Sequence, residues 1–496
     1  MGCGPRTVTI PGILHRRALE TPAAPALDDL SYDELHAGAS RVAAQLRRRG
    51  IANGERLVLY AENSPAYVYA YLGGLRAGAV VVPANVLYRE ADLGRLIDDS
   101  DAIAIAHSRQ SRPFVQTERK VLGLEEIAAW AADPSLPADL EPLPSPQALA
   151  LLIYTSGTTG RAKGAMLTHG NLAAIASQVT TAWRWTSDDV LLLTLPLFHV
   201  HGLAAGLNGT LFAGGRALLR ERFDAADVAT ALRSGNVSMF FGVPTMYVRL
   251  LETAGDARFD RVRLFVSGSA PLLAETHARW REQTGHAVLE RYGMTETNMI
   301  TSNPYDGERR PGAVGFPLPG VSLRVADPDS GAILPQGEVG VVEVKGPNVF
   351  KGYWRMPEKT ASEFRADGFF ITGDLGVIDG DGYLHIVGRA KDLIISGGFN
   401  VYPKEIESEI DAIDGVVESA VIGVPHPDFG EGVAAVVVAR ADAHLDEAAI
   451  LSALADRLAK YKQPKRVLFA ADLPRNAMGK VQKAALRETY KAIYEE

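Results

Sequence analysis

A run of hydroxyl, glycine and basic residues in the middle of the chain is suited to binding phosphate groups. Residues 154–164 have the sequence Tyr-Thr-Ser-Gly-Thr-Thr-Gly-Arg-Ala-Lys-Gly and follow the apolar residues 148–153, which predict a buried strand. Backbone N–H groups, hydroxyls and the cations Arg161 and Lys163 can together surround a polyphosphate. The run is not a Walker A loop, because no Gly-Lys-Ser/Thr follows four residues after a glycine. A flexible surface turn is the alternative.

A second group of chemically useful residues follows a strand-like segment at 287–290. Residues 292–296, Tyr-Gly-Met-Thr-Glu, could stack a base, bond a phosphate and hold Mg²⁺, which commonly takes one or two carboxylates plus substrate phosphates. An ordinary strand-to-helix turn is the alternative. Asp374 after a glycine could accept both ribose hydroxyls, although such an aspartate more often caps a turn. Arg389 and Lys480, each after a glycine, are weak signals alone.

Two histidines, His199 and His201, invite a metal hypothesis, because residues two apart in an extended chain point the same way. No third ligand is close in the sequence, so a structural or pocket-lining role is expected instead. The single cysteine, Cys3, excludes an internal disulfide framework and argues against a metal site built from thiolates.

The composition narrows the class of protein. A length of 496 residues indicates two or more domains. The net charge of −8 argues against a general nucleic-acid binder. The longest apolar stretches are interrupted by charged, histidine or proline residues, and residues 1–6 contain no apolar signal region. We therefore expect a cytoplasmic protein that does not bind membranes.

The pattern along the chain predicts elements that could position these residues. A capping box at Ser31 and Glu34 begins a helix that stops at Gly50, and later strand-like runs alternate with helical ones, which is typical of a mostly parallel sheet covered by helices. After about Gly320, short strands separated by turns predict a β-rich subdomain, and from Pro403 apolar periodicity predicts a separate α/β domain. The strand-like runs are 57–60, 79–82, 190–195, 237–241, 263–266, 321–325, 340–344, 420–424 and 434–439.

Together and in this order, these segments resemble the acyl-adenylate-forming enzymes, which include acyl-CoA synthetases, adenylation domains and luciferases. The similarity covers nearly the whole chain. It implies an α/β fold with a large N-terminal domain of layered sheets and helices, including the β-rich subdomain, at residues 1–388. It implies a hinge at 389–391, centred on Lys391, and a small mobile α/β domain at 392–496.

The resemblance also implies the site. ATP and coenzyme A would be co-substrates with Mg²⁺, and Lys480, Thr295 and Glu296 would be catalytic. Lys480 would bridge the attacking carboxylate and the α-phosphate, which Thr295 touches, while Glu296 and Thr155 would hold the metal. The ATP-binding residues would be Thr155, Ser156, Gly157, Thr158, Thr159, Gly160 and Lys163 at the phosphates, Tyr292 and Gly293 at the adenine, and Asp374 and Arg389 at the ribose. Gly397 and Gly398 would line the path of the pantetheine thiol after the C-terminal domain rotates.

Arg291 indicates which acid is used. A buried guanidinium is costly without a partner, and a second carboxylate on the substrate can accept two parallel hydrogen bonds from it. Pairing with Glu290 or Glu296 is the alternative. Segments 198–202, 289–299 and 475–480 resemble malonyl-CoA synthetases. By this resemblance Arg291, Ser267, Gly268, Met294 and His199 would bind the acyl substrate.

The sequence therefore predicts an ATP-dependent malonyl-CoA synthetase that tolerates methylmalonate. A CoA synthetase for another short acid, such as acetate, propionate or succinate, is the main alternative. Transfer to a carrier protein is less expected, because no carrier segment follows Glu496. A catalytically silent nucleotide-binding relative is a further alternative, against which Lys480, Glu296 and Thr155 argue.

Overall fold

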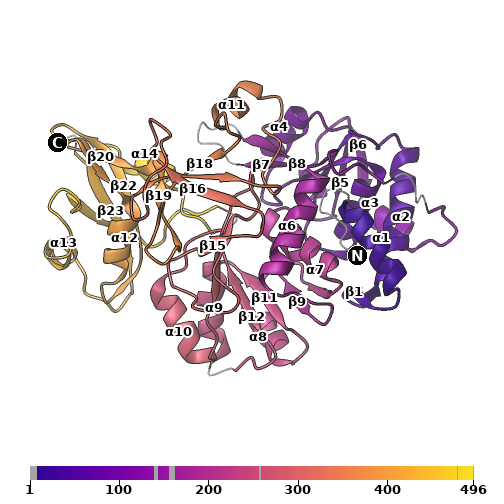
Figure 1. Ribbon diagram of the computed structural model, residues 1–496, viewed down its shortest axis with the longest axis horizontal. Coiled ribbons are helices and arrows are strands. Elements are labelled where there is room, and N and C mark those ends of the chain that lie inside the picture. The colour runs from indigo at the N-terminus through magenta and orange to yellow at the C-terminus, as the bar shows by residue number, and fades with distance from the viewer. Residues whose placement is uncertain (1–7, 139–142, 156–161, 256–257, 477–478, 495–496) are drawn as a thin grey trace.

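The computed structural model describes residues 8–138, 143–155, 162–255, 258–476 and 479–494. Figure 1 shows a large N-terminal domain and a smaller C-terminal domain, which lies at one end of the molecule. The predicted fold class, a layered α/β N-terminal domain with a β-rich part and a smaller α/β C-terminal domain, is confirmed. Among the described residues, no helix is both long enough and apolar enough to span a membrane.

Two sheets of mainly parallel strands form the body of the N-terminal domain. In the first sheet β6, β5, β3, β4 and β7 run parallel, and β8 pairs antiparallel with β7. The β7–β8 pair flanks the predicted phosphate-binding run. The strands in spatial order are β6 (Lys120–Gly123), β5 (Ala104–His107), β3 (Arg56–Tyr60), β4 (Val80–Pro83), β7 (Leu149–Thr155) and β8 (Lys163–Thr168).

The second sheet is longer and carries the second group of site residues at its carboxyl edge. Its strands from β13 to β1 run parallel, and of these β13, β12, β11 and β9 match predicted strands. The strands β14, β15 and β2 add antiparallel pairs at the two edges. Because the carboxyl ends of parallel strands meet at one edge, residues that follow β12 and β13 lie close together. The strands in spatial order are β15 (Phe316–Pro317), β14 (Thr301–Ser302), β13 (Leu289–Tyr292), β12 (Leu264–Ser267), β11 (Met239–Gly242), β9 (Val190–Leu193), β10 (Arg216–Leu219), β1 (Pro25–Leu27) and β2 (Leu30–Ser31).

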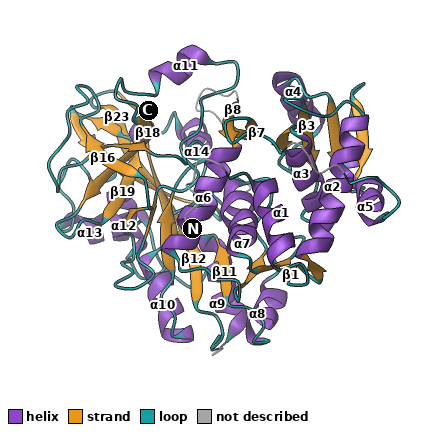
Figure 2. Cartoon of the chain, turned by 45° about the vertical axis from the view of Figure 1, so that its right-hand side comes forward, coloured by secondary structure: helices purple, strands orange, loops and turns teal. Residues whose placement is uncertain are grey.

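Helices fill the space between these sheets and cover their outer faces. Apolar side chains of α1, α2, α3, α5, α6 and α7 form one core with the facing sides of both sheets, and Figure 2 shows α1, α6 and α7 side by side. The outer face of the first sheet packs against α4, and that of the second against α8, α9 and α10. The helices are α1 (Ile10–Glu20), α2 (Tyr32–Arg48), α3 (Pro65–Ala77), α4 (Glu90–Ser100), α5 (Leu124–Ala132), α6 (His169–Ala182), α7 (Asn208–Ala213), α8 (Ala225–Arg233), α9 (Pro244–Ala254) and α10 (Ala274–Thr284), with short turns η1 (Arg112–Phe114) and η2 (His201–Leu207).

The predicted capping box is present at the start of α2. The N–H of Glu34 donates to Ser31 Oγ at 3.2 Å, and the Ser31 N–H donates to Glu34 Oε2 at 2.8 Å. These bonds satisfy backbone donors that the first helical turn leaves without partners. The helix ends at Arg48, two residues before the predicted stop at Gly50.

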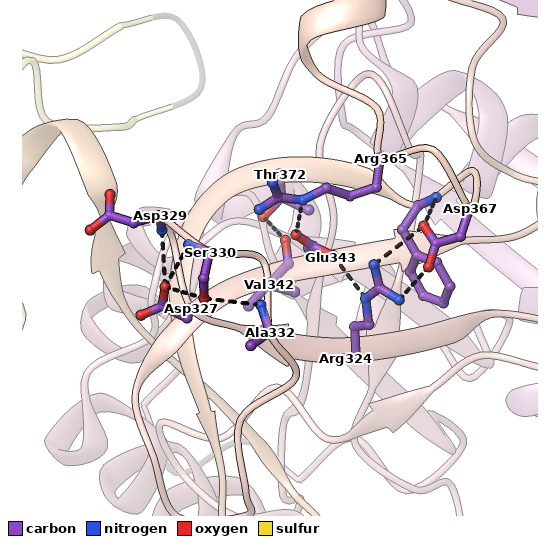
Figure 3. A network of polar contacts seen from close by, with 11 residues as sticks. Arg324, Asp327, Asp329, Ser330, Ala332, Val342, Glu343, Arg365, Asp367 and Thr372 are labelled. Carbon is purple, nitrogen blue, oxygen red and sulfur yellow. Dashed lines mark hydrogen bonds and ion pairs between the residues drawn. The ribbon is translucent and has the colours of Figure 1, made fainter.

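A third, antiparallel sheet forms the β-rich part and is held by a buried carboxylate. Glu343 in β17 is 0% exposed and lies between Arg324 Nε at 2.8 Å and Arg365 Nε at 2.7 Å (Figure 3). Beside it, the Thr372 hydroxyl of β18 donates to the Val342 carbonyl at 2.7 Å. The network thus fixes β18, which carries Asp374, against β17. The elements are β16 (Ser322–Ala326), β17 (Gly340–Lys345), β18 (Phe370–Ile378), β19 (Leu384–Arg389) and α11 (Pro357–Ser362).

The C-terminal domain is a fourth sheet with helices on both faces. Its order is β21-β20-β23-β22, with β24 parallel to β23. Helices α12 and α13 pack on one face and α14 on the other. Helix α12 begins at Pro403 and α13 ends at Ala455, so Leu458 packs into the same core as α12 and α13 from beyond the end of α13. The elements are β20 (Ile394–Ser396), β21 (Phe399–Val401), β22 (Val416–His426), β23 (Gly430–Ala439), β24 (Arg466–Phe469), α12 (Pro403–Asp411), α13 (Glu447–Ala455) and α14 (Lys483–Tyr490).

Candidate active site

Three predicted nucleotide-binding residues from two sheets meet in one hydrogen-bonded group. The Tyr292 hydroxyl at the end of β13 donates to Asp374 Oδ2 at 2.5 Å, and Arg389 Nε contacts Asp374 Oδ1 at 2.6 Å. Asp374 and Arg389 are paired in register across β18 and β19. Burial, and then the neighbouring carboxylate, raise the pKa of Tyr292, so its hydroxyl stays protonated as a donor. The next residue must be Gly293, because a Cβ there would overlap the carbonyl oxygen of Asn298.

Glu296 supplies a buried carboxylate beside this group. Its Oε1 accepts a hydrogen bond from the Tyr353 hydroxyl at 3.0 Å, and burial raises its pKa. Glu296 forms no ion pair with a described residue, and a buried carboxylate without an ion pair favours binding of a divalent ion; Mg²⁺ needs only one or two protein carboxylates. In the described part of the chain, no group of three or more His, Cys, Asp or Glu side chains could hold a metal ion. Thr295, just before it, is half-buried.

The two ends of the predicted phosphate-binding run lie next to each other in the β7–β8 pair. Thr155 and Lys163 are partners in register, and the Thr155 hydroxyl donates to the Lys163 carbonyl at 3.4 Å. The Lys163 ammonium lies 3.7 Å from Glu363 Oε1. Of the predicted ATP-binding residues, Ser156, Gly157, Thr158, Thr159 and Gly160 lie outside the described residues.

The loop that carries Lys480 lies over the N-terminal domain. A Cβ on Gly479 would lie 3.5 Å from Thr245 Oγ1 in α9, so the loop packs against this helix. Lys480 keeps exposed surface, yet burial of its ammonium lowers its pKa to about 8, and the charge of Arg389 adds to this effect. The negative charge of Asp374 raises the pKa of the same ammonium and so partly offsets the effects of burial and Arg389. The structure therefore brings Lys480 to the Tyr292–Asp374–Arg389 group.

Arg291 projects from the end of β13 into a buried space beside Gly268. A Cβ on Gly268 would come within 2.5 Å of the Arg291 Cζ, so the glycine leaves room for the guanidinium. Arg291 is 6% exposed, no described residue accepts a hydrogen bond from its Nε, and burial lowers its pKa. Neither Glu290 nor Glu296 pairs with it: Glu290 Oε1 accepts from the Gly312 N–H at 3.0 Å. Among the described residues, the guanidinium donates a hydrogen bond only to the Ser269 hydroxyl, at 3.5 Å.

Two histidines lie near this guanidinium. Burial and then the Arg291 charge lower the pKa of His199 to about 4, and the same two causes lower the pKa of His201 well below its usual value. His201 is buried and stacks on Phe241, and no described residue forms a hydrogen bond with either of its ring nitrogens. The two histidines do not lie in an extended segment, because His199 is in a bend and His201 begins the π-helical turn η2. Neutral imidazoles beside an unpaired guanidinium form a polar pocket that suits an anion.

The remaining predicted acyl-site residues lie around the same strand ends. Ser267 ends β12 opposite Glu290 and is fully buried, and its hydroxyl has no hydrogen-bond partner in the part of the chain that the structure describes. Met294 is half-buried against the main core. Unpartnered buried polar groups are costly, so their concentration here favours a polar ligand.

The predicted hinge and CoA residues lie apart from this pocket. Lys391 belongs to the short turn η3 (Ala390–Asp392) between β19 and β20. Gly397 and Gly398 form the two-residue turn of the β20–β21 hairpin with φ values of 58° and 81°, a conformation that favours glycine. Both glycines are exposed, and the Gly397 N–H donates to the Phe429 carbonyl within the C-terminal domain.

Sequence reasoning missed two side chains that complete the site. Tyr353 donates toward both Glu296 and Glu363, and Glu363 contacts Lys163. Neither belongs to a recognisable motif. The one local signal was the spacing of Lys359 and Glu363, four residues apart, which pair at 2.6 Å.

Comparison with known proteins agrees with this geometry. Residues 14–354 match the family model described as AMP-binding enzyme, and residues 405–480 match the AMP-binding enzyme C-terminal domain. The chain is 51% identical to a solved structure of ATP-bound MatB from Rhodopseudomonas palustris, with a TM-score of 0.92 over 98% of this chain and 100% of that one.

Two curated relatives differ in their acids. A feruloyl-CoA synthase from an Amycolatopsis species is 38% identical, covering 96% of this chain and 98% of the relative. A malonate–CoA ligase from Arabidopsis thaliana is 36% identical, covering 89% of this chain and 79% of the relative.

Proposed function

Because the chain belongs to the AMP-binding enzyme family and is an AMP-forming acid–thiol ligase, we propose that its acid is malonate, with methylmalonate tolerated. The ligase reaction has two steps. A carboxylate oxygen attacks the α-phosphorus of ATP, which gives acyl-AMP and pyrophosphate. The thiol of coenzyme A then attacks the acyl carbon, which gives the thioester and AMP.

The buried, unpaired guanidinium of Arg291 carries the choice of acid. Its partners among the described residues do not neutralise it, and Gly268 leaves space around it. A dicarboxylic acid would place one carboxylate at the α-phosphate and the other against Arg291, where two parallel hydrogen bonds are available. A feruloyl group has no second carboxylate and would leave the guanidinium unpaired, so Arg291 favours the malonate-type relatives over the feruloyl-type relative.

The other residues would perform the adenylation step as follows. Tyr292 would lie against the adenine, and Asp374 with Arg389 would hold the ribose. The attacking carboxylate and the phosphate are both anions, so the protonated amine of Lys480 would offset their repulsion, and Thr295 would contact the α-phosphate. Glu296, with Thr155, would hold Mg²⁺, which when bound neutralises phosphate charge.

The second step needs a different arrangement of the domains. Lys480 lies at the nucleotide group, whereas the Gly397–Gly398 turn is exposed elsewhere on the C-terminal domain. We propose that residues 392–496 rotate about a hinge at 389–391, centred on Lys391. The rotation would move Lys480 away from the N-terminal domain, residues 1–388. It would also bring the Gly397–Gly398 turn to the acyl-AMP, where the thiol enters.

The test is ATP–pyrophosphate exchange with acetate, butyrate, benzoate, malonate, methylmalonate and succinate. Malonate should give the highest kcat/KM. Arg291→Ala should lower kcat/KM for malonate about 10²-fold to 10³-fold, as expected for removing one partner of a buried charge pair, and change that for monocarboxylates far less.

Arg309→Ala is the matched control, because Arg309 is also partly buried beside β13 but donates to the Ala287 carbonyl at 2.7 Å. Its effect should be equal for all six acids. A monocarboxylate that leads in the wild type, with little effect of Arg291→Ala, would refute malonate and leave the ligase class intact.

A further inference from the structure

The segment after β17 and before α11 brings an aromatic side chain to the phosphate-binding run. The Lys351 N–H donates to the Met166 carbonyl at 2.9 Å, and the Trp354 N–H donates to the Gly164 carbonyl at 2.8 Å. This pairing extends the first sheet beyond β8. Tyr353, in the middle of the segment, therefore lies next to Lys163, whose ammonium is 5.0 Å from the centre of the tyrosine ring.

Glu363, directly after α11, reaches the same place. Its Oε2 accepts from the Tyr353 hydroxyl at 2.7 Å. Its Oε1 contacts two ammonium groups, Lys359 at 2.6 Å and Lys163 at 3.7 Å. The Lys163 and Glu363 side chains are 12% and 19% exposed, so this pair is shielded more than an ordinary surface pair.

Tyr353 also connects Glu363 to the proposed metal ligand. Its hydroxyl lies 3.0 Å from Glu296 Oε1 and 2.7 Å from Glu363 Oε2. Lys163, which is predicted to contact the phosphates, and Glu296, which is proposed to hold Mg²⁺, are therefore joined through Tyr353 and Glu363. Glu363 occupies the position of an anion opposite Lys163.

We propose that Glu363 is a positioning residue that neutralises Lys163 while the site is empty and releases it to the polyphosphate of ATP. The proposal rests on the proposed ligase function and on the phosphate-binding role that the sequence predicts for Lys163. The polyphosphate of ATP carries several negative charges and Glu363 carries one, so the polyphosphate attracts the Lys163 ammonium more strongly and displaces the Glu363 carboxylate from it. After pyrophosphate leaves, the Glu363 carboxylate pairs with the Lys163 ammonium again. This pairing competes with rebinding of pyrophosphate before the thiol of coenzyme A arrives.

The experiment measures the Kd of MgATP by calorimetry with no carboxylic acid present, so that no turnover occurs. Glu363→Gln keeps an oxygen acceptor for Tyr353 but removes the competing charge, so MgATP should bind about two- to fivefold tighter, the size expected for a partly exposed ion pair. Lys359→Gln should instead weaken MgATP binding. Glu363 Oε1 then has Lys163 as its remaining cation partner, so it should hold Lys163 more strongly against the polyphosphate. This second variant changes a position that is 40% exposed and should fold normally.

Both changes are repeated in a Lys163→Gln background. If Glu363 acts through Lys163, neither substitution changes the Kd there. Tightening that persists without Lys163 would show a general charge effect and overturn the proposal, as would weaker or unchanged binding in Glu363→Gln. If Lys163→Gln alone leaves MgATP binding unchanged, the proposed phosphate-binding role of Lys163 fails instead.

Discussion

Lys480 lies where charges of both signs meet. Arg389 and Lys391 disfavour its protonated form, Asp374 and Asp392 favour it, and burial of the ammonium has the largest effect. The proposed adenylation step needs the protonated amine, because a neutral amine would not offset the repulsion between carboxylate and phosphate. The surroundings of Lys480 therefore place a pH limit on the first half-reaction.

Pyrophosphate exchange should lose activity on the alkaline side. With the pKa of Lys480 lowered to about 8, the amine is protonated below this pH and neutral above it. The kcat/KM, which reports the free enzyme, should therefore fall about tenfold per pH unit above pH 8. Acetate serves as the acid, so that Arg291 takes no part in the profile.

Lys480→Arg is the control, since a guanidinium stays charged throughout this range. Its rate will be lower, but the fall near pH 8 should disappear. Persistence of the fall in this variant would assign it to another group.

At the residue scale, the sequence identified several motif residues that the structure brings together, but it did not identify the residues that contact them. Tyr292, Asp374 and Arg389 were each identified from short motifs, and the structure joins them. Tyr353 and Glu363 were missed, because their positions depend on pairing of residues 351–354 with β8 across nearly 190 residues of chain.

At the scale of elements, local signals were recovered and irregular ones were not. The capping box of α2 and the parallel strands β9, β11, β12 and β13 follow from residue pattern alone. The π-helical turn η2 does not, because its backbone packs closely against the segment that follows β9: a Cβ on Gly202 would lie 2.6 Å from the Pro196 carbonyl oxygen. That turn nevertheless positions His201, and such turns are frequent at functional sites.

The antiparallel sheet β16–β19 should depend on its buried carboxylate. Glu343→Gln would leave Arg324 and Arg365 without their shared partner, and removing one member of a buried pair costs about 3 kcal/mol of unfolding free energy. The urea midpoint of the variant measures this loss. Because Asp374 is in the same sheet, MgATP affinity should fall as well.

Asp414→Asn is the comparison, since Asp414 is 93% exposed and pairs with the exposed Arg440. Its midpoint should stay within about 0.5 kcal/mol of the wild type. An equal effect of both substitutions would show that the buried network does not hold the sheet.

At the scale of the whole molecule, the structure has the domain orientation that places Lys480 over the nucleotide group. The contact between Gly479 and Thr245 belongs to this orientation. The proposed thioester-forming step requires this contact to break, so we assign the contact to the orientation that carries out adenylation.

A disulfide across this contact should separate the two half-reactions. The chain has one native cysteine, so Cys3→Ser gives a background for Thr245→Cys with Gly479→Cys. A Cβ at position 479 would lie close enough to the side chain at position 245 for a disulfide bond to form after a modest adjustment. Oxidised enzyme should keep pyrophosphate exchange and lose thioester formation, and reduction should restore the latter.

The single substitutions control for strain at Gly479, whose φ is 73°. Thioester formation at equal rates in the oxidised and reduced forms would show that the orientations need not exchange, and would refute the hinge.

The unpaired guanidinium of Arg291 also has a consequence for the lifetime of the protein. A buried charge without a partner counts against the folded state, and a bound dicarboxylate would relieve that cost. The pocket would then make its own substrate a stabilising ligand. In a cell that lacks the acid, the folded chain would open more often and meet proteases sooner, so that the amount of enzyme would follow the supply of the compound it uses.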